Sequence, residues 1–129
     1  MDIILNGTTL AYIGDGYYEL RIRDYIISLG VTKGNDLHQM AVKFTSGKAQ
    51  SRIIMNFLEN DLLSEKEIDA YKKGRNVTGI SRKNLSLQEY HQATGFESLI
   101  GYLYLNDKKR ADELIELAII YIKKEQIDG

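Results

Sequence analysis

Apolar residues recur every three or four positions between residues 8 and 29, and this spacing predicts one long helix. One stripe along the helix holds Leu10, Ile13, Tyr17, Leu20 and Ile27. A second stripe holds Ala11, Asp15, Tyr18, Ile22 and Ile26. Because a helix that is apolar on more than one face is usually central to its domain, we expect Asp15 to point into a second layer of packing or across a subunit interface.

Two shorter helices are predicted next, each beginning at a residue that can cap a helix. Asn35 or Asp36 can cap a helix that runs to about residue 44. Ser46 can cap another that runs to about residue 60. The inward face of this second helix is expected to carry Ala49, Ile53 and Phe57.

The rest of the chain contains two capping boxes, in which a serine and a glutamate three residues later each accept from the other's backbone N–H. Ser64 with Glu67 begins a helix that ends near residue 74, and Ser86 with Glu89 begins one that runs to about residue 105. A last amphipathic helix is expected over residues 108–126. Residues 74–84, GRNVTGISRKN, have two glycines and weak periodicity, which predicts a loop. The pattern predicts an all-α fold of about six helices in one domain, residues 1–129.

Composition removes several classes of function. The 129 residues include no cysteine, which excludes disulfides, zinc–thiolate sites and thiol chemistry. No apolar run is long enough to span a membrane and the N-terminus lacks a secretory signal, so we expect a cytoplasmic protein. The loop at 74–84 lacks the residue order of a nucleotide phosphate loop, so no nucleotide cofactor is expected.

Charge is distributed unevenly along the chain although the net charge is only −1. Residues 37–58 hold three basic residues and no acid, and residues 59–71 hold five acids and one lysine. Residues 72–88 again hold five basic residues and no acid. Because local potential guides encounter with a charged partner, a polyanion can bind this chain despite its net charge.

Two carboxylates stand on apolar helices beside glycine. Asp15 lies between Gly14 and Gly16, and Glu97 precedes Gly101 by one helical turn. If the two helices cross there, the like charges repel unless a cation lies between them. Magnesium prefers such carboxylate oxygens and keeps several waters. The simpler interpretation, that each carboxylate is exposed at a rim or paired with a basic residue, stays open.

Both segments resemble known motifs. The stretch LAYIGDGYYEL, residues 10–20, resembles the signature helix of the ribonuclease III family, and FESLIGYLYL, residues 96–105, resembles that family's second acidic helix. The shortness of the chain, with KKGRN and the NDLH segment at 35–38, resembles the Mini-III subgroup. The resemblance covers nearly the whole chain and implies a ribonuclease III-like helical endonuclease domain without a separate double-stranded-RNA-binding domain.

The resemblance also implies which residues act. Asp15 and Glu97 match the positions that the family uses for catalysis and for binding Mg²⁺. Full-length members carry a glutamate where this chain has Ala11 and an aspartate where it has Thr94, so half of the acidic cluster is absent. Water and the RNA phosphate would complete the coordination of the metal.

The activity implied by the resemblance is magnesium-dependent cleavage of double-stranded RNA by a homodimer with one acidic site per subunit. The products would carry 5′-phosphate and 3′-hydroxyl ends. Resemblance to the Mini-III subgroup implies maturation of the precursor of large-subunit (23S) ribosomal RNA in a bacterium. We further expect Gly14 and Gly16 to let the first helix pack against its symmetry mate.

Basic residues around the predicted loop fit an RNA partner, because side chains of this kind meet phosphate and sugar oxygens. The expected RNA-binding residues are Lys72, Lys73, Arg75, Arg82 and Lys83. A solvated charged loop is the simpler alternative.

Two other functions remain possible from the sequence. Ala11 and Thr94 keep open a catalytically inactive RNA-binding or ribosome-associated domain of the same fold. A helical protein-interaction module is possible if the basic loop is incidental. His38 and His91 are expected to be surface or capping residues rather than general bases.

Overall fold

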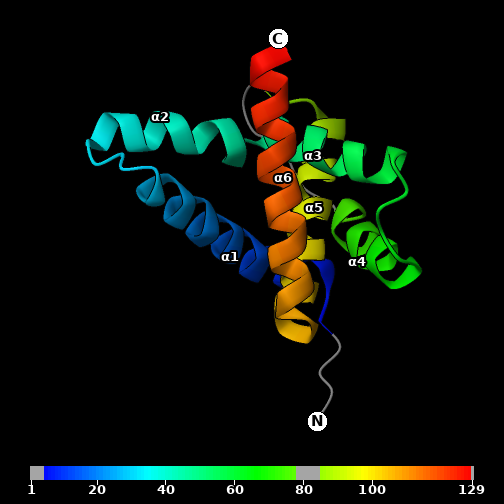
Figure 1. Cartoon of the computed structure of the whole chain (residues 1–129). Helices are drawn as coiled ribbons and strands as arrows, with labels where there is room; N and C mark the ends of the chain where they lie inside the picture. The colour runs from blue at the N-terminus through cyan, green and yellow to red at the C-terminus, as the bar shows by residue number, and fades with distance from the viewer. Residues whose placement is uncertain (1–4, 78–84, 129) are drawn as a thin grey trace.

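The computed structural model describes residues 5–77 and 85–128, and this part of the chain forms α-helices and no strand. The helices are α1 (Gly7–Ser28), α2 (Gly34–Thr45), α3 (Gly47–Glu59), α4 (Glu65–Arg75), α5 (Leu87–Asn106) and α6 (Lys108–Asp128) (Figure 1). The all-α prediction is confirmed. Within the described ranges, no helix has both the length and the apolar content that crossing a bilayer requires.

Side chains at the helix starts explain why most helices begin where they do. Both predicted capping boxes are formed: the Ser64 hydroxyl accepts from the Glu67 N–H at 3.2 Å, and the Ser86 hydroxyl accepts from the Glu89 N–H at 3.0 Å. Each glutamate carboxylate accepts in return from the serine N–H. Ser46 caps α3 as predicted. Local sequence therefore fixes these three starts.

The start of α2 differs from the prediction. The helix begins at Gly34 after Lys33, and no side chain caps it, so neither Asn35 nor Asp36 is the N-cap. Asp36 instead lies in the first turn. There its negative charge favours the positive end of the helix dipole, so the acid stabilises this start from inside the helix.

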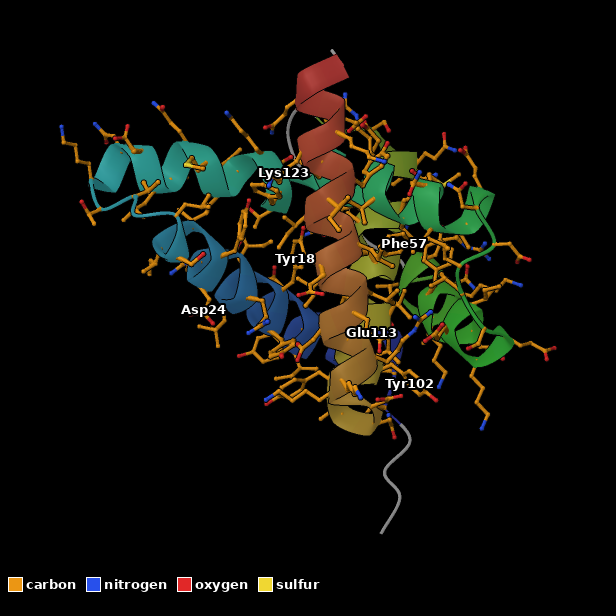
Figure 2. All side chains as sticks on the ribbon, in the orientation of Figure 1. Tyr18, Asp24, Phe57, Tyr102, Glu113 and Lys123 are labelled. Carbon is orange, nitrogen blue, oxygen red and sulfur yellow. The ribbon has the colours of Figure 1, made fainter. Side chains whose placement is uncertain are left out.

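Helix α5 lies at the centre of the fold and packs against α1, α3, α4 and α6 (Figure 1). Tyr18 of α1, Phe57 of α3 and Phe96 of α5 are fully buried together, and Figure 2 labels the first two. The rings of Tyr18 and Phe96 meet edge to face with centroids 5.0 Å apart. The buried Tyr18 hydroxyl donates to the Phe44 carbonyl at 2.8 Å, which satisfies it. The inward face predicted for α3 is confirmed: Ala49, Ile53 and Phe57 are buried.

The two apolar stripes of α1 meet different surroundings. Tyr18, Ile22 and Ile26 of the second stripe are buried. The first stripe reaches the core only in its N-terminal half, since Leu20 is 55% exposed and Ile27 is 62% exposed. One chain therefore covers only part of this helix, and α1 presents apolar side chains on its outer surface.

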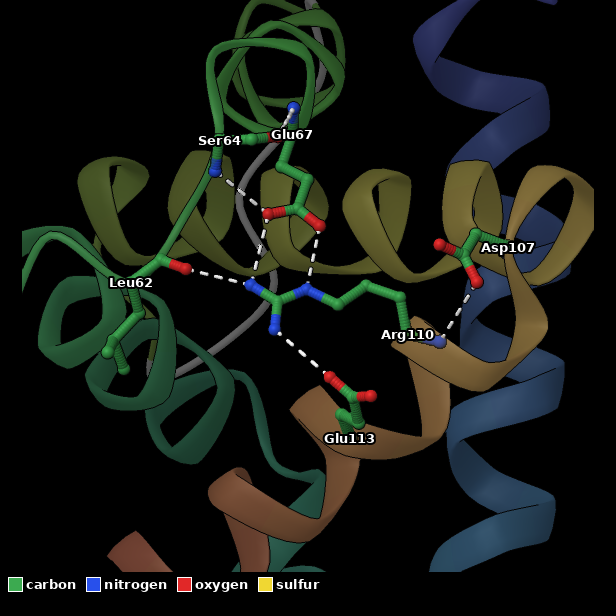
Figure 3. A network of polar contacts seen from close by, with 6 residues as sticks. All are labelled: Leu62, Ser64, Glu67, Asp107, Arg110 and Glu113. Carbon is green, nitrogen blue, oxygen red and sulfur yellow. Dashed lines mark hydrogen bonds and ion pairs between the residues drawn. The ribbon is translucent and has the colours of Figure 1, made fainter.

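A single arginine ties α6 to α4 and to the segment before α4 (Figure 3). The Arg110 guanidinium donates to the Glu67 carboxylate from Nε at 2.9 Å and from a terminal nitrogen at 3.2 Å. It also donates to the Leu62 carbonyl at 2.8 Å and to the Glu113 carboxylate at 3.3 Å. Burial raises the pKa of the Glu67 carboxyl, but the bonds from Arg110 and Ser64 and the positive charge of Arg110 outweigh it, so this pKa lies below its usual value.

Candidate active site

Helices α1 and α5 touch through their backbones at two glycines. A Cβ atom placed on Gly14 would lie 1.8 Å from the Glu97 carbonyl oxygen, and one placed on Gly101 would lie 1.9 Å from the Leu10 carbonyl oxygen. No side chain fits at either position, because real Cβ contacts are never this short. The predicted crossing of the two acidic helices is therefore present, and glycine is what allows it.

The crossing corrects one expectation about these glycines. Gly14 packs against α5 of its own chain, so its close approach is not to a symmetry mate. A Cβ atom placed on Gly16 would have no neighbour within 4 Å, so this glycine serves no contact within the described part of the chain. The sequence indicates that a backbone comes close to α1, but the partner lies more than 80 residues away and no local pattern identifies it.

Asp15 and Glu97 come from the two helices where these meet. Asp15 directly follows Gly14, and Glu97 supplies the carbonyl that Gly14 approaches. Asp15 is exposed and Glu97 is half-buried, so Asp15 does not point into a second layer of packing within the described part of this chain. Among residues 5–77 and 85–128, Asp15 makes no hydrogen bond or ion pair. Within the described part of the chain, its charge is therefore available to a ligand.

The two positions one turn earlier carry no charge. Ala11 is 7% exposed, and the Thr94 hydroxyl donates to the Tyr90 carbonyl at 2.9 Å. Within the described part of the chain, no group of three or more histidine, cysteine, aspartate or glutamate side chains could hold a metal. Asp15 and Glu97 are therefore the carboxylates that the two helices offer at the crossing, and carboxylate oxygens are ligands that magnesium prefers.

The basic end of α4 lies beside this crossing, also through glycine contacts. A Cβ on Gly7 of α1 would lie 2.1 Å from the Lys73 carbonyl oxygen, and one on Gly74 would lie 2.5 Å from the Thr94 carbonyl oxygen. Thr94 stands one turn before Glu97 on α5. The last turn of α4 is therefore held between the start of α1 and the acidic turn of α5.

The expected RNA-binding residues divide into three groups. Lys72 and Lys73 are exposed in the last turn of α4. Arg75 is half-buried, with its guanidinium 5.7 Å from the centroid of the Tyr71 ring, and it is helical, so the predicted loop begins after it rather than at residue 74. Arg82 and Lys83 lie outside the described residues.

A polar cluster beside the crossing was not predicted from the sequence. The Tyr17 hydroxyl donates to Asp112 of α6, and the Tyr17 ring lies 4.6 Å from that of Tyr104, between centroids. Arg21 lies 3.6 Å from the same Asp112 carboxylate. Burial, followed by the hydrogen bond to Asp112, raises the pKa of Tyr17 to about 12. Tyr17 follows Gly14 by one turn and Tyr104 follows Gly101 by one turn, and this matched spacing was the available signal.

Neither histidine lies among the residues at the crossing. His38 is exposed on α2 and lines a groove between α1 and α2. His91 is half-buried on α5, and its Nδ1 is buried without a hydrogen-bond partner among the described residues. The surface role expected for His38 fits its exposure, whereas His91 is neither fully at the surface nor a cap.

Comparison with known proteins identifies relatives of nearly the same length. The model of the ribonuclease III domain family matches residues 8–108. A "Mini-ribonuclease 3" of Acholeplasma laidlawii is 51% identical over 97% of this chain and 100% of its own, and one of Enterococcus faecalis is 49% identical over 89% of each. A crystal structure of a protein from Fusobacterium nucleatum superposes with a TM-score of 0.80 at 28% identity, covering 90% of this chain and 93% of that one.

Proposed function

Because the chain belongs to the ribonuclease III family, a family of endoribonucleases that act on double-stranded RNA, we propose that it is a magnesium-dependent endoribonuclease that cleaves RNA duplexes. The observation that carries this proposal is the pair Asp15 and Glu97 at the glycine crossing of α1 and α5. Asp15 is exposed and has no partner among the described residues, so its side chain takes no part in stabilising this part of the fold.

Asp15 and Glu97 are the proposed catalytic and metal-binding residues. Two carboxylates are enough for a hard divalent cation that retains water. When bound, Mg²⁺ supplies Lewis-acid stabilisation and an activated water for phosphodiester cleavage. The carboxylates hold negative oxygen at the site, and rigid packing at Gly14 and Gly101 keeps their two backbones in register.

The basic residues at the end of α4 are proposed to hold the RNA beside the acidic pair. Lys72 and Lys73 are exposed and Arg75 lies against Tyr71, next to the turn of α5 that precedes Glu97. Lysine and arginine at such positions bind phosphates without reading sequence, which suits a double helix recognised by its shape. Arg82 and Lys83 are proposed to extend this contact.

A homodimer is proposed as the acting form, because cutting both strands of a duplex in one encounter needs two acidic sites. The outer face of α1 is suited to pairing about a twofold axis. Tyr12 is 82% exposed next to Asp15, and the apolar Leu20 and Ile27 are exposed on the same helix. The proposed products carry 5′-phosphate and 3′-hydroxyl ends.

The proposed substrate is the precursor of 23S ribosomal RNA, cut in the cytoplasm. This finer proposal depends on similarity to proteins named Mini-ribonuclease 3, which match this chain at 35–51% identity. A second candidate function is an inactive RNA-binding or ribosome-associated domain. It is favoured by Ala11 and Thr94, which leave the acidic cluster with two members.

Incubation of a structured RNA duplex with the purified chain, with magnesium and with a chelator, separates the two functions. We expect cleavage of both strands with magnesium and none with the chelator. Sedimentation of the same sample tests the homodimer. Binding of the duplex without cleavage at any magnesium concentration would contradict the proposal and support the inactive domain.

A further inference from the structure

The acid-free stretch 37–58 places its three basic residues around one cavity. Lys43 from the last turn of α2, and Lys48 and Arg52 from the first turns of α3, line a cavity of about 610 Å³. The C-terminal part of α6 closes its other side with Ile122 and Glu125. The proposed function does not use this cavity, whose α6 residues lie in the C-terminal turns of that helix. Figure 1 shows where α6 ends.

The residues that line the cavity carry a net positive charge. Among the side chains of residues 5–77 and 85–126, no carboxylate forms an ion pair with Lys43, Lys48 or Arg52. Glu125 is the acid that lines the cavity. Burial, followed by the charge of Glu125, raises the pKa of the Tyr121 hydroxyl. Three cations and one carboxylate leave the described lining with a net charge of +2.

The cavity is well separated from the acidic crossing. Tyr17, one turn after Gly14, contacts Asp112 near the start of α6, whereas the cavity is lined by α6 residues 122, 125 and 126. Ten to fourteen residues of helix at 1.5 Å each separate the two places by about 15–20 Å. A ligand bound at the crossing reaches the cavity only if it is an extended molecule.

We propose that this cavity binds backbone phosphates of the RNA at a distance from the cleavage site. The inference depends on the proposed function for the identity of the polyanion. All three cations are exposed, so they suit a chain of phosphates that passes along the surface rather than a small anion held by buried donors. The site is a second, sequence-independent contact that favours long duplexes over short ones.

The test compares a double variant, Lys48→Gln with Arg52→Gln, with the unchanged chain. Duplex binding is measured without magnesium across a range of salt. One duplex extends about 20 Å past the scissile bond, and a shorter one contains the scissile bond but does not extend far enough to reach the cavity. Each lost phosphate contact lowers the slope of log affinity against log salt by about 1. We expect a loss of about 2 in slope for the long duplex and no change for the short one.

A matched control removes the same charge elsewhere: Lys66→Gln with Lys109→Gln, both exposed and outside the cavity. We expect this control to bind both duplexes like the unchanged chain. An unaltered slope for the long duplex, or equal losses for the cavity variant and the control, would overturn the proposal.

Two further measurements test the chemical identity of the ligand and the proposed cleavage activity. If inorganic phosphate raises the melting temperature of the unchanged chain but not of the cavity variant, and the salt slope for the long duplex is the same in both, the ligand is a free phosphate and the RNA assignment is wrong. Cleavage of the short duplex with magnesium should be the same in both chains. Absence of cleavage in both would contradict the proposed function while leaving the salt slopes to decide the cavity.

Discussion

Glu67 and Asp15 are both carboxylates on helices, but they meet opposite surroundings. The Glu67 side chain is 8% exposed and accepts from Arg110 and from the Ser64 backbone. Asp15 is exposed and has no partner among the described residues. It nevertheless follows Gly14, where α1 approaches the α5 backbone so closely that a Cβ atom would lie 1.8 Å from the Glu97 carbonyl oxygen.

The difference separates charge that stabilises the fold from charge that is available to a ligand. Burying Glu67 costs free energy that its hydrogen bonds and ion pair must offset. Asp15 needs no such compensation, because water reaches it. At Asp15 the backbone is held in place, because the neighbouring Gly14 packs against α5. At Glu67 the side chain itself is held in place by its hydrogen bonds to Arg110 and Ser64.

The largest expected effect comes from neutralising the acidic pair. Asp15→Asn or Glu97→Gln removes a negative ligand while keeping the size of the side chain. Since a metal site supplies several kcal/mol of charge stabilisation and 1.4 kcal/mol is tenfold in rate, duplex cleavage should fall by about 100-fold or more, with duplex binding nearly unchanged. Single-turnover cleavage assays measure this.

The control for that experiment is Asp24→Asn, another exposed carboxylate on α1, which Figure 2 labels. Its ion pair to Arg21 spans 3.9 Å at the surface and contributes little. We expect Asp24→Asn to cleave like the unchanged chain. Full activity in Asp15→Asn would show that Asp15 is neither a catalytic nor a metal-binding residue.

The second prediction tests the close backbone contact between α1 and α5 at Gly14. Gly14→Ala places a methyl group 1.8 Å from the Glu97 carbonyl oxygen and forces α1 and α5 apart. It should lower the free energy of unfolding by about 3 kcal/mol, measured by urea denaturation. Gly16→Ala is the matched control: with open space around it, it should raise stability by about 0.5–1 kcal/mol, because alanine favours helix.

A smaller effect is expected at the buried ion pair. Arg110→Met leaves the Glu67 charge buried without its partner, and should lower the free energy of unfolding by about 2–3 kcal/mol. Arg110→Met combined with Glu67→Gln removes both charges and keeps the capping geometry of α4, so it should recover part of that loss. If the double variant were less stable than the unchanged chain by as much as the two single losses combined, the two residues would be independent.

The smallest effect is on pH dependence. Because the pKa of Glu67 is lower in the folded chain than the usual 4.5, this carboxyl stabilises the fold above that pH, and the contribution is lost as pH falls through the folded pKa. We expect the free energy of unfolding to fall more steeply below about pH 4.5 in the unchanged chain than in Glu67→Gln. Urea titrations between about pH 6 and pH 3 compare the two. Parallel curves would show that Glu67 is not the group responsible.

Helix positions followed from the sequence because their signals are local. Ser64 and Glu67 sit three residues apart, and their capping box needs nothing from the rest of the fold. The start of α2 was assigned to the wrong residue because Asn35 and Asp36 are both residue types that can cap a helix. Asp36 is also favourable inside the first turn, next to the positive end of the helix dipole. Glu67 and Arg110, which form an ion pair, are 43 residues apart in the sequence. No local sequence pattern near either residue predicts that they meet.

The close contact between the two helices that carry Asp15 and Glu97 was predictable from the sequence, whereas the exposure of the two side chains was not. Glycine next to Asp15 and Glu97 indicated close helix contact, and Gly14 and Gly101 provide it. Burial could not be predicted for Asp15, because the other members of its stripe (Ala11, Tyr18, Ile22 and Ile26) are buried while Asp15 is exposed. Whether side chains of a stripe are covered depends on neighbouring helices that periodicity does not describe.

The central place of α5 has a consequence for how the molecule opens. Its amides are surrounded by α1, α3, α4 and α6, so they should exchange with solvent deuterium only when several helices leave together. Glu97 belongs to α5. Local fraying of α4 or α6 would therefore leave the Glu97 amide protected from exchange. On heating, Asp15 and Glu97 should separate only in the cooperative step that unfolds the whole chain.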